Sequence, residues 1–202
     1  RIELPPGEDA VNLADLFDGA RSGIWLEVGF GAGEHLLEQA RLRPDAGLIG
    51  CEPFLDGVAK LVQALDADGI GNVRIFMDDA RLLLQRLPAS CLAGVFVLFS
   101  DPWPKKRHHK RRFVDTPTLD LIARAMAPGA ELRIATDDCS YLVWILQHMQ
   151  RADEFEWLAR RPEDWRRRPP DWPVTRYERK AIAARRECIY LRYRRRDLER
   201  VV

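Results

Sequence analysis

Long apolar runs and internal repeats are both missing from this sequence. No apolar stretch approaches the roughly 20 residues that a membrane-spanning helix requires, so we expect no membrane segment. Residues 1–9 lack the apolar core of a signal peptide, and the chain does not begin with Met. The absence of a long apolar run and of a signal-peptide core argues against a membrane-bound or secreted protein, whereas the missing Met leaves open whether a segment precedes residue 1.

The few cysteines are too widely spaced to form a metal motif. They are Cys51, Cys91, Cys139 and Cys188. No C-x-x-C pair occurs among them, so we expect neither structural disulfides nor a metal site. Most lie in or beside apolar segments and are expected to be buried thiols, which favours a cytoplasmic location.

Composition indicates a single globular domain over residues 1–202. Hydrophobic residues make up 47% of the chain and charged residues 31%, which is the balance of a folded protein rather than a disordered one. A chain of 202 residues can bury a substantial core.

Charge is distributed unevenly, although the net charge is only +1. Residues 1–100 hold 8 Lys and Arg against 15 Asp and Glu, whereas residues 101–202 hold 24 against 16. A basic second half suggests a polyanionic partner that binds on one side. A solvated charged surface explains the same counts equally well.

Apolar runs alternate with segments of helical spacing along most of the chain. The predicted strands are residues 24–29, 48–51, 73–77, 95–99, 131–135 and 189–193. The predicted helices are residues 34–43, 54–65, 79–87, 113–126 and 141–149. Repeated strand–helix units indicate an α/β fold with a parallel sheet covered on both faces. Ligands of such folds bind beyond the carboxyl ends of the strands.

A glycine-rich loop follows the first predicted strand. It reads EVGFGAGE over residues 27–34, so its third glycine comes one place too early for the dinucleotide pattern G-x-G-x-x-G. The acid before the loop disfavours a pyrophosphate. S-adenosylmethionine carries an ammonium, a sulfonium and a ribose diol, all of which suit carboxylates. Glu52 ends the next strand, near the ~20-residue spacing at which an acid meets ribose hydroxyls. Asp79 ends the third, where it could bind a ligand, cap a helix or do both.

The most informative stretch follows the most apolar strand. Asp101, Pro102 and Trp103 come first, and eight consecutive basic or His residues occupy 105–112. Prolines stiffen the loop, and the basic run can bind RNA phosphates. The alternative is a run that resembles a nuclear-localisation signal or is merely solvated. Metal binding by His108 and His109 is disfavoured because no matching ligand is spaced near them.

Residues 160–186 differ from the rest because Pro and Arg dominate. The segment is too rich in Pro for a long helix and is predicted to be an extended substrate loop. We expect Trp165 and Trp172 to anchor this loop and Tyr177 to contact substrate. Residues 166–168 could bind phosphates or stay solvated.

Together these motifs resemble the tRNA (guanine-N7-)-methyltransferase family of class I methyltransferases. The matching residues are EVGFGAGE (27–34), Glu52, Asp79-Ala80, DPWPKKRHHKRR (101–112), ATDD (135–138) and TRYE (175–178). The likeness spans about residues 24–193, and DPW with its basic run is highly specific. Two departures are Arg176-Tyr177, where many relatives have Lys-Phe, and the absence of a basic N-terminal extension.

The resemblance implies a Rossmann-like, mostly parallel seven-stranded sheet flanked by helices. It also implies methyl transfer from S-adenosylmethionine, without a metal, to N7 of guanine 46 in the tRNA variable loop, leaving S-adenosylhomocysteine. The implied donor-binding residues are Glu27, Gly29, Gly31, Gly33, Glu52, Asp79 and Asp101. The implied RNA-binding residues are Lys105, Asp137, Thr175, Arg176, Tyr177 and Glu178. No obligatory protein partner is evident, and the chain is expected to be a monomer or homodimer.

The chemistry needs no general base, because guanine N7 has a lone pair and no proton to lose. The hypothesis assigns catalysis to Asp137, which holds the guanine edge, and Asp101, which links donor and substrate. Three alternatives remain: a nicotinamide-dependent oxidoreductase, a non-catalytic RNA-binding module, and a methyltransferase with another substrate such as rRNA or a small molecule.

Overall fold

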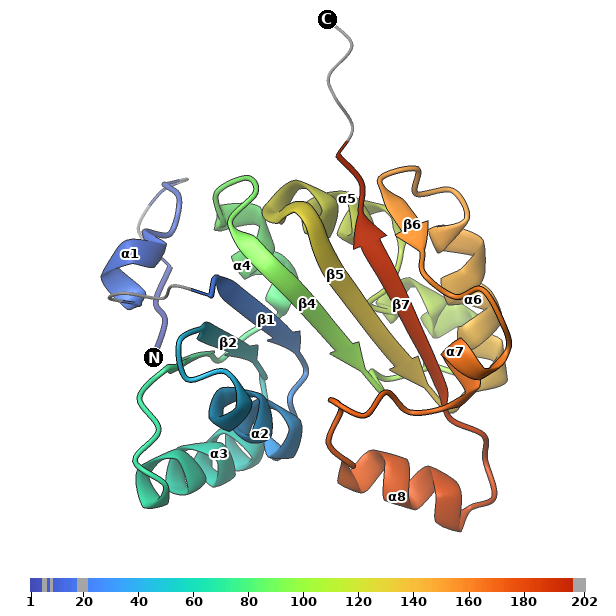
Figure 1. Ribbon diagram of the computed structural model, residues 1–202, viewed down its shortest axis with the longest axis horizontal. Coiled ribbons are helices and arrows are strands. Elements are labelled where there is room, and N and C mark those ends of the chain that lie inside the picture. The colour runs from blue at the N-terminus through green and yellow to red at the C-terminus, as the bar shows by residue number, and fades with distance from the viewer. Residues whose placement is uncertain (5–6, 8, 18–21, 198–202) are drawn as a thin grey trace, which may run out of the picture.

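A seven-stranded sheet runs through the computed structural model, which describes residues 1–4, 7, 9–17 and 22–197 (Figure 1). The strands are β1 (Ile24–Val28), β2 (Gly47–Cys51), β3 (Val73–Phe76), β4 (Leu92–Leu98), β5 (Met126–Thr136), β6 (Phe155–Trp157) and β7 (Ile189–Arg195). Their order is β3-β2-β1-β4-β5-β7-β6. Strands β1 to β5 are parallel, and β7 is antiparallel to both β5 and β6. This confirms the predicted Rossmann-like, mostly parallel seven-stranded sheet.

Helices cover both faces of the sheet. They are α1 (Leu13–Leu16), α2 (Glu34–Leu42), α3 (Leu55–Ala67), α4 (Ala80–Arg86), α5 (Thr116–Ala125), α6 (Cys139–Met149), α7 (Glu163–Arg166) and α8 (Arg176–Ala183), with a short 3₁₀ helix, η1 (Lys106–Arg111). Helices α4, α5 and α6 supply buried residues to the core on one face, whereas α2 and α3 pack on the other face beside β2 and β3.

Strand β4 lies at the centre and pairs with β1 on one side and β5 on the other. Every residue of β4 except Ala93 is buried, as expected for a strand covered on both faces. Its alternate side chains therefore enter two different cores. Val95 and Val97 join the core under α4 to α6, while Phe96 and Leu98 join a small cluster that includes Trp172.

The prediction of an extended loop over residues 160–186 is wrong in part, because α7 and α8 lie within it. The prolines at 162, 169, 170 and 173 all precede α8, so none interrupts that helix. Thr175 caps α8, since its hydroxyl accepts a hydrogen bond of 3.2 Å from the Glu178 amide. The predicted anchoring by Trp172 is confirmed by its burial in the cluster on β4, β5 and β7.

Other short elements were not predicted. They are α1, η1, β6 and α7, each of three to six residues. Strand β5 also begins at Met126, five residues before the predicted start. Elements this short contain too few turns or alternations to produce a recognisable period.

Within the described part of the chain, no helix has both the length and the apolar character needed to cross a membrane. All four cysteines are free. Burial raises the pKa of the Cys51 thiol, and the nearby Asp79 and Glu52 carboxylates raise it further. Cys51 is therefore kept protonated and unreactive.

A first prediction concerns the packing of β4 against β1. A methyl group at Gly94 would lie 2.2 Å from Cζ3 of Trp25, so Gly94→Ala should lower the free energy of unfolding by about 1–3 kcal/mol. Gly71→Ala is the matched control, because nothing lies within 4 Å of a methyl group there. Urea denaturation of both variants checks this, and equal midpoints would contradict the packing described.

Candidate functional site

Two adjoining cavities open at the carboxyl ends of the parallel strands. The first, the glycine cavity, has a volume of about 420 Å³ and lies between the glycine loop, the start of α3, the β4–η1 loop and α8. The second, the aspartate cavity, has about 390 Å³ and extends towards the start of α4. Both are lined by Gly29, Pro53, Phe54, Ser100 and Asp101. They therefore form one continuous site around the ends of β1, β2, β3 and β4.

The glycine loop has a backbone shape that other residues rarely adopt. Gly29, Gly31 and Gly33 have φ angles of +68°, +59° and +82°. Nothing lies within 4 Å of a methyl group placed at Gly29, so its backbone is open to a ligand. Gly33 instead begins α2 and packs against α3, where a methyl group would lie 2.6 Å from Leu61 Cδ1. Two of the three predicted glycines thus line the cavity, and the third holds α2 against α3.

Glu52 holds the loop and lines the glycine cavity. Its Oε2 accepts a 2.8 Å hydrogen bond from the Gly31 amide, and its Oε1 accepts one of 3.1 Å from the Phe54 amide. Gly57 of α3 permits this arrangement, because a methyl group there would lie 2.1 Å from the Gly31 carbonyl oxygen. A buried carboxylate oriented by two amides is a fixed negative charge at the cavity wall.

Glu27 lines neither the glycine cavity nor the aspartate cavity. It is buried, and its Oε2 lies 2.7 Å from His35 Nδ1. Both residues border a hollow of about 20 Å³ beneath Thr175 and Tyr177, which shares Gly29, Ala32, Phe99, Arg176 and Tyr177 with the glycine cavity. The structure therefore places Glu27 beside the glycine cavity but not on its lining, and its predicted contact with the donor stays a prediction.

Asp79 lies in the aspartate cavity and also caps α4. Its Oδ1 accepts a 2.9 Å hydrogen bond from the Arg81 amide, and its Oδ2 lies 3.0 Å from Arg81 Nη1. The same guanidinium donates to the Arg112 carbonyl at 2.8 Å and to Thr118 Oγ1 at 3.0 Å. The cap is thus present, and Arg81 fixes the direction of the carboxylate. No local sequence pattern marks Arg81, because its role depends on contacts with distant residues.

The loop after β4 places Asp101 at the edge of both cavities. Phe99 and Trp103 flank it with φ angles of +51° and +43°, which are uncommon for residues other than glycine. Such backbone strain costs about 1–3 kcal/mol and is frequent at functional sites. The Asp101 side chain is exposed at the mouth of the site. It is well placed to contact both a bound donor and an incoming substrate.

The basic run divides into an exposed part and a buried end. Lys105 precedes η1 and is exposed, as is most of η1 itself, while Arg111 lies with its guanidinium 4.7 Å from the Trp103 ring. Arg112 is only 1% exposed. Its Nε donates to the Pro102 carbonyl at 2.8 Å and its Nη2 to Ser140 Oγ at 2.9 Å. The expectation that the whole run can bind phosphate is therefore wrong for Arg112, which braces the Asp101 loop.

The remaining predicted residues form a second group near α8. Asp137 pairs with Arg186, whose Nε lies 2.8 Å from Asp137 Oδ2. Glu178 is buried, accepts a 2.6 Å hydrogen bond from the Tyr190 hydroxyl and lies 3.1 Å from Arg168 Nε. Neither acid lines the glycine or the aspartate cavity. The predicted RNA-binding acids are therefore engaged by the protein's own side chains.

Helix α8 closes one side of the glycine cavity through Arg176 and Tyr177. Tyr177 Cε2 lies 3.1 Å from the place of a methyl group on Gly31. Glu34 holds the helix there, since its Oε2 accepts a 2.7 Å hydrogen bond from the Arg176 amide and its Oε1 lies 3.4 Å from Arg179 Nη2. A carboxylate at a helix N-terminus also interacts favourably with the helix dipole. Sequence analysis included Glu34 only as the last letter of the glycine motif.

Among the described residues, no three His, Cys, Asp or Glu side chains are grouped so that they could hold a metal ion. The expected independence from metal stays a prediction. The residues at the two cavities do fit S-adenosylmethionine. Gly29 offers open backbone, and Glu52, Asp79 and Asp101 place negative charge around a space suited to a cationic ligand.

This sheet order, the glycine loop and the acids at successive strand ends define a class I S-adenosylmethionine-dependent methyltransferase fold. An rRNA methylase from Streptococcus thermophilus has a similar structure, with a TM-score of 0.60 and 14% identity over 92% of each chain. The family model described as "Putative methyltransferase" matches residues 21–191.

Curated relatives define the family more narrowly. The tRNA (guanine-N(7)-)-methyltransferase of Rhodospirillum rubrum is 49% identical over 90% of this chain and 71% of its own length. The enzyme of the same name from Zymomonas mobilis is 49% identical over 93% of this chain and 81% of its own length. The chain belongs to the tRNA (guanine-N7-)-methyltransferase family.

A second prediction tests the docking of α8. Glu34→Gln removes the charge that binds the Arg176 amide and the Arg179 guanidinium, so the wall of the glycine cavity should loosen. We expect S-adenosylhomocysteine to bind about three- to tenfold more weakly, as measured by isothermal titration. Glu38→Gln, on the same helix but paired only with Arg41, should bind it as the unaltered protein does. Equal affinities for all three proteins would contradict the proposed wall.

Proposed function

We propose that this chain transfers the methyl group of S-adenosylmethionine to N7 of guanine 46 in the variable loop of tRNA. The observation that carries the proposal is the position of the exposed basic η1 directly beside a site with three acids at adjoining strand ends. The names of the curated relatives support the base and the atom. The sequence resemblance supports the position in the tRNA.

The reaction places few demands on acid–base chemistry. When bound, S-adenosylmethionine supplies an electrophilic methyl group on its sulfonium. Guanine N7 attacks with a lone pair and loses no proton, so the protein has only to align N7 with the methyl group. The methylated base becomes cationic, and Asp101 can stabilise that charge from the edge of both cavities.

Recognition of the RNA is assigned to η1 and to the residues around α8, among which Arg176 and Tyr177 line the glycine cavity and Arg111 lines the aspartate cavity. Lys105 and the exposed residues of η1 are proposed to bind phosphates, which makes affinity fall as salt rises. Asp137 is proposed to hold the guanine edge. Because Asp137 is paired with Arg186, the base has to replace this partner, and Arg186 then becomes available to a phosphate. Glu178 lies in the same region and can support the arrangement.

The expected partners follow from this proposal. The tRNA is the polyanion that the basic second half of the chain indicates. The cytoplasmic location, the monomeric or homodimeric state and the absence of an obligatory protein partner stay predictions.

A third prediction tests the function itself. The purified chain, incubated with S-adenosylmethionine and an unmodified tRNA transcript, should produce one aniline-cleavable site at guanine 46. A transcript with adenine at that position is the control and should remain uncleaved. Cleavage at another guanine would reject the position, and cleavage only in rRNA would favour a different RNA substrate.

Ligand binding separates the remaining alternatives. Titration with S-adenosylhomocysteine should release or absorb heat, whereas NADH should produce none. Binding of NADH alone would favour an oxidoreductase. A protein that binds tRNA but neither S-adenosylhomocysteine nor NADH would favour a non-catalytic RNA-binding module.

A fourth prediction concerns Asp137. Asp137→Ala should lower turnover by about a hundredfold, because a fixed charge near the developing cation is lost. Affinity for S-adenosylhomocysteine should stay nearly unchanged, since Asp137 lines neither large cavity. Asp120→Ala, which removes an exposed carboxylate of α5, is the control. Unchanged turnover in Asp137→Ala would remove this residue from catalysis.

A further inference from the structure

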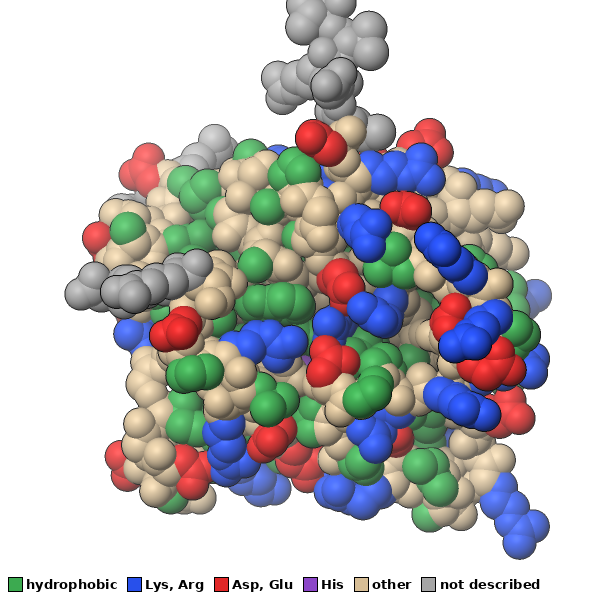
Figure 2. All heavy atoms as spheres, in the orientation of Figure 1, with side chains coloured by type: hydrophobic (Ala, Val, Ile, Leu, Met, Phe, Trp, Pro, Cys, Tyr) green, Lys and Arg blue, Asp and Glu red, His purple; other side chains and the backbone are tan. Residues whose placement is uncertain are grey.

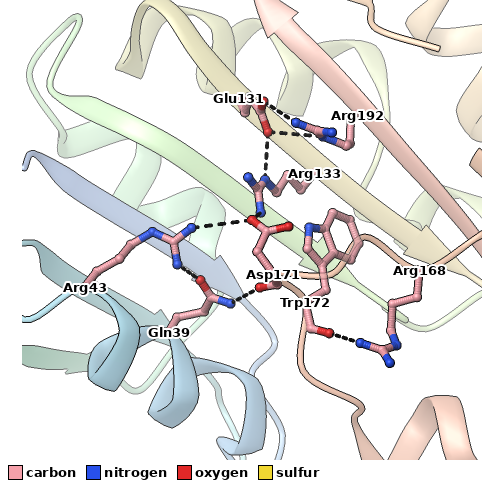
Figure 3. Close-up of polar contacts among 8 residues, drawn as sticks. All are labelled: Gln39, Arg43, Glu131, Arg133, Arg168, Asp171, Trp172 and Arg192. Carbon is pink, nitrogen blue, oxygen red and sulfur yellow. Dashed lines mark hydrogen bonds and ion pairs between the residues drawn. The ribbon is translucent and has the colours of Figure 1, made fainter. Parts of the chain in front are cut away.

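Asp171 lies where segments from both halves of the sheet meet (Figure 3). Its Oδ2 accepts a 2.6 Å hydrogen bond from Arg133 Nη1 on β5, and its backbone carbonyl accepts one of 3.0 Å from Gln39 Nε2 on α2. Arg43, just after α2, adds an ion pair at 3.8 Å and also bonds Gln39. Asp171, which lies between α7 and α8, thus contacts both α2, the helix that follows the glycine loop, and β5.

The guanidinium that binds Asp171 is itself firmly held. Arg133 is 6% exposed and lies within 5.7 Å of the ring centres of Trp25, Phe96 and Trp172. Its Nε donates to Glu131 Oε2 at 2.8 Å, and Glu131 is also bonded by Arg192 of β7. Figure 2 shows basic and acidic side chains interleaved over this face of the molecule. Arg133 is therefore a rigid attachment point.

Arg133 changes the pKa of the Asp171 carboxyl group. Partial burial acts to raise the pKa of Asp171, but the hydrogen bond and charge of Arg133 outweigh burial and lower the pKa below its usual range. The carboxylate is thus charged at neutral pH and favours the docked arrangement.

Trp172 extends the attachment towards α8. Its side chain is 2% exposed and covers β4, β5 and β7 on the face where α2 and α3 cover the other strands. Its carbonyl accepts a hydrogen bond from Arg168, which also pairs with Glu178 of α8. Only Pro173 and Val174 separate Trp172 from the cap of α8, and Pro restricts the backbone of this link.

We propose that Asp171 is a positioning residue that sets where α8 begins and hence where Tyr177 meets the glycine loop. Asp171 lines neither the glycine cavity nor the aspartate cavity, so its effect on them passes through the elements that it joins, and α8 is the one that carries Tyr177. The expected effect of Asp171 on catalysis rests on the proposed methyl transfer to tRNA. Its expected effect on the position of α8 beside the glycine loop does not depend on that proposal.

The kinetic test compares Asp171→Asn with Glu163→Gln. Both remove one negative charge from the same segment, and the Glu163 side chain is exposed at the start of α7. Because Asp171 is about half exposed, we expect Asp171→Asn to lower kcat/KM for tRNA by about three- to tenfold. Asp171→Glu, which keeps the charge, should recover most of this loss, and Glu163→Gln should change little.

A double-mutant cycle distinguishes positioning from general weakening of the fold. If Asp171 acts through α8, the losses of Asp171→Asn and Tyr177→Ala should be coupled, so the double variant loses less than the product of the two. Glu163→Gln and Tyr177→Ala should combine by simple multiplication. Independent losses for Asp171 and Tyr177 would overturn the proposal.

Trypsin gives a readout that does not depend on activity. Release of the anchor in Asp171→Asn should speed cleavage after Arg166 and Arg167 several-fold, at a temperature where urea titration shows the protein still folded. An unchanged cleavage rate would overturn the proposal even if methylation is impaired. If trypsin cleaves Asp171→Asn faster but the unaltered protein transfers no methyl group to tRNA, the proposed function is rejected and the positioning role of Asp171 stands.

Discussion

The close approach of the glycine loop to the start of α3 is the constraint on which the site depends. The Gly31 carbonyl oxygen would lie 2.1 Å from a methyl group on Gly57, and Glu52 binds the amides of Gly31 and Phe54 at once. This contact holds the glycine loop against α3 beside the paired ends of β1 and β2, and Gly29 faces open space. A carboxylate already oriented by two amides needs little rearrangement to meet a cationic ligand, so this wall of the glycine cavity is preorganised.

The substrate side is built differently, because it is held by side chains that come from distant parts of the chain. Glu34 binds the start of α8, and Asp171 joins α2 to β5. Asp137 meanwhile is paired with Arg186. Each of these contacts joins a carboxylate to a group on a different element. None of the three carboxylates binds the Gly31 or Phe54 amide that Glu52 holds. Under the proposed function, an RNA that displaces Arg186 from Asp137 leaves the contacts of Glu34 and Glu52 in place, so the glycine cavity keeps its shape.

The sequence pattern predicted six of the seven strands because they are buried runs with clear limits, and β4 is the plainest case, whereas β6 has only three residues. It also located the acids at three strand ends, Glu52, Asp79 and Asp101, which the structure brings around two joined cavities. It could not predict α8, whose neighbouring prolines dominate the composition although none lies inside the helix. Nor could it separate Arg112 from its exposed neighbours, since burial of one guanidinium depends on Pro102 and Ser140 folding over it. The ion pair between Asp137 and Arg186 joins residues far apart in the chain, and no local pattern records such a contact.

The central claim is that the acids at neighbouring strand ends surround one space that binds the methyl donor. A crystal structure of the protein with S-adenosylhomocysteine tests this most directly. The account predicts that the ligand occupies the two joined cavities, lies against the Gly29 backbone and is within hydrogen-bonding distance of Glu52. Density for the ligand elsewhere, with Glu52 still bound only to the Gly31 and Phe54 amides, would contradict the account.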